Sequence, residues 1–162
     1  MFALRCNQRF IDKPAKKIFF TVDSSDTPIN YAFMEGPGGI VGSGRIEVFR
    51  DDCCIVEIMQ KIASCLQTES CGKCLFCREG THQMSDILAD IAKNRGQSGD
   101  IDLLIELGEA MKINCLCLLG RTAAVPLLGS ISQFHDDYDT HLKGKCRKSG
   151  NQPLKIVRSE YP

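Results

Sequence analysis

From Asp51 onward, apolar residues recur every three or four positions, which is the spacing of amphipathic helices. Four helices are predicted. The first is capped by Asp51 or Asp52 and runs to about Thr68, and the second runs from about Glu79 to Asn94. The third is capped by Ser98 or Asp100, and the fourth runs from about Thr122 to Leu142. Pro126 is expected in the first turn of the last helix, where a missing N–H costs little. The short connections predict an antiparallel four-helix bundle over residues 51–142. The apolar faces expected to line its core are Ile55, Ile58, Met59, Ile62, Cys65 and Leu66; Met84, Ile87, Leu88 and Ile91; Leu103, Leu104, Leu107 and Met111; and Val125, Leu128, Ile131, Phe134, Tyr138 and Leu142.

Residues 1–50 have a different pattern. Lys17–Val22 and Arg45–Phe49 are strand candidates, and the turn-forming stretches DSSDTP and GPGGIVGSG lie between them. The predicted fold class is therefore α+β, with a small β-rich N-terminal region followed by the bundle. Residues 143–162 are basic at first and end with a short apolar piece, Leu154–Val157. We expect this extended tail to order only against a neighbour.

Composition narrows the class of protein. The 162 residues carry 20 basic and 20 acidic side chains, so no overall field favours nucleic acid or an anionic membrane. No apolar run is long enough for a membrane span, and the N-terminus resembles no signal peptide. A cytoplasmic, reducing location is expected. Ten cysteines are unusual for a protein of a reducing compartment, and they favour metal binding or redox chemistry over structural disulfides.

The segment ESCGKCLFC places Cys71, Cys74 and Cys77 at intervals of three. Three thiolates of one loop require a fourth ligand from elsewhere, and Cys115 and Cys117 are the candidates, since a helical hairpin returns the chain to the end where it started. The main alternative is zinc held by four thiolates, but such sites usually pair two C-x-x-C segments. The spacing of three plus one therefore favours a [4Fe–4S] cluster. A thioredoxin-like dithiol lacks its βαβ context here.

Other chemistry-bearing residues have simpler interpretations. Cys6, Cys53, Cys54, Cys65 and Cys146 match no second cluster and are expected to be core residues or loop thiols. The histidines form no catalytic arrangement: we expect His82 on a helix surface, and His135 and His141 on a solvated face beside three aspartates. The glycine-rich stretch leads into a strand rather than a helix, so it does not predict a phosphate-binding loop.

Two segments together resemble a known family. ESCGKCLFCREG and CLCLLGRTAAVPLL resemble the C-terminal iron–sulfur domain of the NADH-binding flavoprotein subunit of respiratory complex I, a module also found in NAD-linked hydrogenases and formate dehydrogenases. DTPINY and GSGRIEVF resemble the end of the small β domain that precedes it, and FHDDYDTHL resembles its last helix. The resemblance covers roughly Asp26 to Leu142.

The resemblance implies that Cys71, Cys74, Cys77 and Cys117 hold one [4Fe–4S] cluster, because Cys115 falls at a serine position of the family signature. Leu118 and Arg121 stand where the signature has glycine and glutamine. The residues expected to tune the cluster potential are Lys73, Arg78 and Arg121, and those expected to screen the cluster from water are Leu75, Phe76, Leu116 and Leu118.

The functional prediction follows from the resemblance. The chain is expected to be an electron-transfer subunit of a NAD-linked hydrogenase, formate dehydrogenase or similar complex, without activity alone. FMN and NADH are expected on a partner subunit, in a hetero-oligomer of flavin- and iron–sulfur-bearing subunits. The alternatives are a structural zinc module for assembly and a small NADH-oxidising diaphorase.

Overall fold

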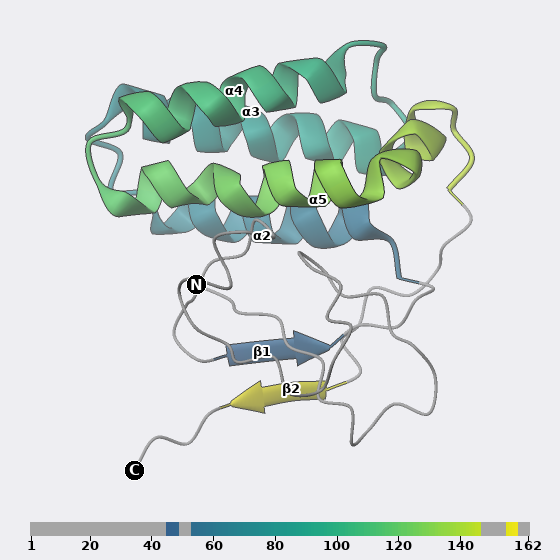
Figure 1. Ribbon diagram of the computed structural model, residues 1–162, viewed down its shortest axis with the longest axis horizontal. Coiled ribbons are helices and arrows are strands. Elements are labelled where there is room, and N and C mark those ends of the chain that lie inside the picture. The colour runs from purple at the N-terminus through teal and green to yellow at the C-terminus, as the bar shows by residue number, and fades with distance from the viewer. Residues whose placement is uncertain (1–44, 49–52, 147–154, 159–162) are drawn as a thin grey trace.

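The computed structural model describes residues 45–48, 53–146 and 155–158, and its principal feature is a four-helix bundle (Figure 1). The helices are α2 (Ile55–Glu69), α3 (Leu75–Ala92), α4 (Asp100–Asn114) and α5 (Leu118–Leu142). Helix α2 packs against α3 and α5, and α4 packs against the same two helices, so α2 and α4 lie diagonally opposite. The predicted antiparallel bundle is thus confirmed. No helix among these residues has the length and apolarity that crossing a bilayer requires.

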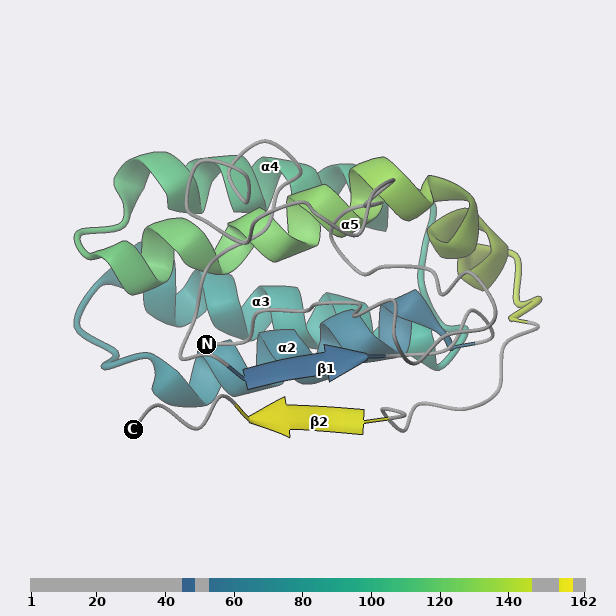
Figure 2. The ribbon, with the colours of Figure 1, turned by 60° about the horizontal axis from the view of Figure 1, so that its bottom comes forward.

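The core of the bundle contains most of the apolar positions expected from periodicity. Met59, Met84, Leu88, Ile91 and Met111 have almost no exposed surface. Figure 2 shows α4 and α5 as one layer and α2 and α3 as the other. At roughly 25 cal/mol per Å² of apolar surface removed from water, burial of these side chains is the main force that assembles the bundle.

The buried face of α4 differs from the prediction. Leu104 is fully buried, but Leu103 is 46% exposed. The true face consists of Ile101, Leu104, Gly108 and Met111, which follow a strict spacing of three and four. Adjacent helix positions point about 100° apart, and packing against α3 and α5 decides which of the two leucines is buried.

Two helices begin earlier than predicted. Helix α3 begins at Leu75 and α5 at Leu118, each directly after a cysteine in extended conformation. Pro126 therefore lies about two turns inside α5 rather than in its first turn, and its ring nitrogen gives no hydrogen bond to the preceding turn. Helix α2 also differs, because its N-cap residue is Cys54 rather than an aspartate.

Helix α5 is interrupted at Phe134, whose φ of −128° and ψ of 33° are not helical. A buried hydrogen bond of 2.7 Å between the Ser130 and Tyr138 hydroxyls spans this interruption. The Ser130 hydroxyl also donates to the Leu127 carbonyl at 2.8 Å. The last two turns of α5 are therefore fixed to the straight part of the helix by side chains as well as by backbone.

Two strands pair outside the bundle, on the side of α2 in Figure 1. Strand β1 (Arg45–Val48) pairs antiparallel with β2 (Lys155–Arg158), and Arg45 lies opposite Arg158. The strand predicted at Arg45–Phe49 is confirmed for its first four residues. The tail was expected to order only against a neighbour, but β2 pairs with the same chain, because β1 offers an edge to it. The predicted strand at Lys17–Val22 and the glycine-rich stretch lie outside the described residues.

Candidate metal centre

The loop between α2 and α3 carries the three regularly spaced cysteines. Cys71 is exposed, Cys74 is the N-cap residue of α3, and Cys77 is buried in the first turn of that helix. Gly72 has a φ of +74°, a conformation that glycine adopts without strain. The positive φ turns the chain sharply between the first two cysteines.

Hydrogen bonds hold this loop in shape. The Ser70 hydroxyl lies 3.3 Å from the Cys77 sulfur and accepts a hydrogen bond from the Gly72 N–H at the same distance. Arg78 donates to the Gly72 carbonyl at 3.0 Å and pairs with Glu79 at 2.8 Å. Arg78 was expected near the ligands to tune their potential, and it also ties the loop to α3. Lys73 lies exposed in the same loop.

The loop between α4 and α5 supplies two further cysteines in different environments. Cys115 is the C-cap residue of α4 and is 1% exposed, whereas Cys117 is the exposed N-cap residue of α5. The Nε atom of Arg121 donates to the Cys115 carbonyl at 2.8 Å. This bond fixes the short segment between the two helices.

The two loops meet at one end of the bundle. A Cβ added at Gly120 would lie 2.7 Å from the Cys115 sulfur and 3.2 Å from the Cys77 Cβ. Real Cβ atoms essentially never approach another atom to 2.7 Å, so only glycine lets α5 start so close to both cysteines. The helical hairpin therefore returns the chain to the first cysteine loop, as the sequence predicted.

The thiols at this end differ in acidity. Hydrogen bonds from the backbone of Cys77 and then of Leu116 lower the pKa of Cys74. Burial, together with the neighbouring Cys74 and Cys77, raises the pKa of Cys115 to about 12. The N-termini of α3 and α5 also face this end, and their unpaired N–H groups favour negative charge.

The apolar residues around these thiols are open to solvent. Leu75 is 59% exposed, Leu116 81%, Leu118 72% and Phe76 44%. Their role in screening a bound cluster from water stays a prediction. They form an apolar rim around the two loops.

The donor set at this end suits an iron–sulfur cluster. Thiolates are the protein ligands of such clusters, and both loops here supply them together with backbone N–H groups. His82 is exposed and pairs with Asp86 at 3.0 Å, so it remains a surface residue as expected.

The opposite end of the bundle contains a group that sequence reasoning missed. The Cys54 sulfur lies 2.8 Å from Nε2 of His141, and both side chains are buried. The ligand atoms of Cys54, His141 and Cys146 all lie within 4.8 Å of one another. His141 was expected on a solvated face, which is wrong because the interruption at Phe134 turns the last turns of α5. His135 on the same helix is exposed, as expected. The only sequence signal was a histidine followed five residues later by a cysteine.

Comparisons with known proteins agree with the geometry of the first end. Residues 57–141 match the family described as the NADH-ubiquinone oxidoreductase-F iron–sulfur binding region. The chain is 32% identical over 126 residues to the F subunit of the NADH-quinone oxidoreductase of Streptomyces coelicolor, covering 78% of this chain and 28% of that protein. It is 34% identical over 120 residues to the HndC subunit of the NADP-reducing hydrogenase of Solidesulfovibrio fructosivorans, covering 74% and 24%.

A solved structure gives the same result. A chain from the crystal structure of an NAD⁺-reducing [NiFe]-hydrogenase in the H2-reduced state superposes with a TM-score of 0.56 at 29% identity, covering 60% of this chain and 16% of that one. The chain thus spans about a quarter of the length of these curated relatives. It belongs to the family of the NADH-ubiquinone oxidoreductase-F iron–sulfur binding region, whose members carry a [4Fe–4S] binding region.

Proposed function

We propose that the chain holds one [4Fe–4S] cluster through Cys71, Cys74, Cys77 and Cys117, and that it relays single electrons between redox centres of partner subunits. The observation that carries this proposal is the contact between the two cysteine loops at one end of the bundle, where Gly120 lies against Cys77 and Cys115. A bound cluster supplies the one-electron redox chemistry at this position.

The fourth ligand is the least obvious, and the two candidates differ physically. Cys115 is buried, and its raised pKa keeps the thiol protonated. Cys117 is the exposed N-cap residue of α5, so a cluster held against the two loops can reach its sulfur. A cluster needs thiolates, so Cys117 is the better ligand and Cys115 a packing residue behind it.

The remaining residues stabilise negative charge and fix the loops. Arg78 and Arg121 each donate to a loop carbonyl, at 3.0 and 2.8 Å, so their charges stay beside the thiols. Lys73 adds a third, solvated cation. Together with the two helix N-termini, they would favour the more negative, reduced form of a bound cluster and raise its potential.

Partner subunits account for the apolar rim. Leu75, Leu116 and Leu118 are each more than half exposed around the two loops, so a partner that covers them would remove apolar surface and water together. We place the FMN and NADH sites on such a partner, in a cytoplasmic oxidoreductase of the NAD-linked hydrogenase or formate dehydrogenase type. Residues 1–50 and 143–162 would flank the cluster domain as docking segments.

The test is metal analysis of protein purified without oxygen. We expect iron and acid-labile sulfide in equal amounts, with a broad visible absorption that dithionite bleaches. Cys117→Ser should remove most of this absorption, and Cys115→Ser should retain it. Zinc in place of iron would contradict the proposal, and a reversed order of the two variants would contradict the choice of ligand. Bound flavin with NADH turnover would favour a diaphorase instead.

A further inference from the structure

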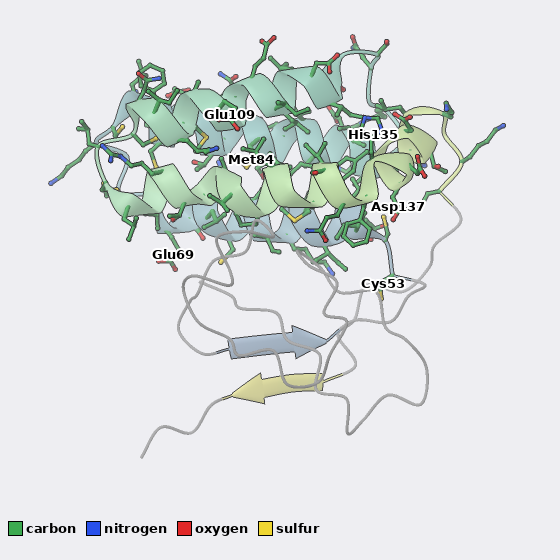
Figure 3. All side chains as sticks on the ribbon, in the orientation of Figure 1. Cys53, Glu69, Met84, Glu109, His135 and Asp137 are labelled. Carbon is green, nitrogen blue, oxygen red and sulfur yellow. The ribbon has the colours of Figure 1, made fainter. Side chains whose placement is uncertain are left out.

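The group at the far end of the bundle joins two segments that are distant in sequence, one before α2 and one at the end of α5. Cys54 precedes α2, His141 lies in the last turn of α5, and Cys146 follows that helix. In Figure 3 the neighbouring Cys53 marks this end, whereas Glu69, at the other end of α2, lies near the iron–sulfur loops. The group is therefore separate from the proposed cluster site by the length of α2.

We propose that Cys54, His141 and Cys146 bind a zinc ion. Two thiols and one imidazole are the donor types that zinc prefers in proteins. Their ligand atoms lie within 4.8 Å of one another, and ligands of one tetrahedral zinc stand roughly 3.5–3.8 Å apart at ordinary bond lengths. The separation of 2.8 Å between the Cys54 sulfur and Nε2 of His141 need only widen by less than about 1 Å.

Burial supports a metal over a chance contact. Cys54 is 1% and His141 is 2% exposed, while Cys146 is half-buried. Removing an imidazole from water is costly unless its polar atoms gain strong partners, and a metal ion is such a partner. Cys54 lies 87 positions before His141, so only folding brings it to the pair His141 and Cys146.

The position of the group indicates a structural role. A zinc ion there would connect the start of α2 to the end of α5 and to the chain that follows it. Tyr138, which lies near Cys54 and bonds to Ser130, already fixes the same turns of α5. Three protein ligands leave the fourth zinc position to a water molecule or to a donor outside this group.

The first experiment measures zinc on the intact chain with its iron–sulfur cluster loaded, so that the cluster cysteines are occupied. After removal of loosely bound metal with a chelator, zinc is added and quantified by mass spectrometry beside iron. We expect one zinc per chain. Cys54→Ser, His141→Gln and Cys146→Ser should each lower bound zinc by more than about tenfold without lowering iron.

Matched controls use residues of the same type elsewhere. Cys65→Ser changes a half-buried thiol of α2, and His135→Gln changes an exposed histidine of α5, so both should keep zinc. Cys146 lies outside the helices, which makes Cys146→Ser the variant least able to disturb folding. Cobalt in place of zinc should give the visible spectrum of a tetrahedral thiolate site in the parent chain and lose it in Cys146→Ser.

Three results would overturn the proposal. The first is no zinc retained by the cluster-loaded chain. The second is zinc that persists in all three ligand variants. The third is a disulfide between Cys54 and Cys146 in protein purified under reducing conditions. Because iron is measured in the same samples, failure of the zinc site is distinguishable from failure of the cluster site.

Discussion

The hydrogen bond between Ser130 and Tyr138 allows a quantitative prediction. Both hydroxyls are fully buried, and burial raises the pKa of Tyr138, so the phenol remains neutral and can donate. Since the Ser130 hydroxyl already donates to the Leu127 carbonyl, the Tyr138 hydroxyl must be the donor in the shared bond. The two partners therefore have unequal roles.

Removing Ser130 and removing Tyr138 should lower the free energy of unfolding by different amounts. Ser130→Ala leaves a buried phenol donor without an acceptor, so we expect a loss of about 2 kcal/mol in the free energy of unfolding. Tyr138→Phe leaves Ser130 still bonded to Leu127, so the loss should be about 1 kcal/mol. The double variant leaves two apolar groups in contact and should lose about 1 kcal/mol, well below the sum of the single losses.

The assay is urea unfolding of the cluster-loaded chain without oxygen, followed by far-UV circular dichroism for the parent and the three variants. Ser130→Thr, which keeps a hydroxyl, is the control for the acceptor. Additive single losses, or a smaller loss for Ser130→Ala than for Tyr138→Phe, would refute the assigned donor and the coupling. The interruption at Phe134 would then be held by backbone packing alone.

Three further predictions concern the core and the cluster end. Leu104→Ala should cost about 2–5 kcal/mol in urea unfolding, whereas Leu103→Ala should cost less than about 1 kcal/mol, and equal losses would contradict the observed face of α4. Gly120→Ala should lower the iron bound per chain, because the new Cβ would lie 2.7 Å from the Cys115 sulfur. The overpacking cost of about 1–3 kcal/mol exceeds the gain in helix propensity of about 1 kcal/mol. Unchanged iron would show that the loop moves to make room. Arg121→Gln should lower the cluster midpoint potential in a redox titration followed by EPR, since a cation held at the Cys115 carbonyl is lost; an unchanged or raised midpoint would contradict this role.

Local patterns in the chain predicted the bundle and the kind of site at one of its ends. Helical periodicity is a local property, so four helices and most of their core positions were predictable. The regular interval of Cys71, Cys74 and Cys77 also favoured an iron–sulfur cluster over zinc without knowledge of the fold. Helix starts were less predictable, because α3 and α5 begin directly after cysteines that are weak capping residues.

Which residues contact each other depended on how the helices pack. Leu103 and Leu104 are equivalent in composition, and packing alone buries the second. Cys54 and His141 are 87 positions apart and match no motif, so their contact depends on the antiparallel course of α2 and α5 and on the interruption at Phe134. Local patterns reveal ligands that share a loop, whereas ligands that lie far apart in the sequence become visible only when the helices have packed.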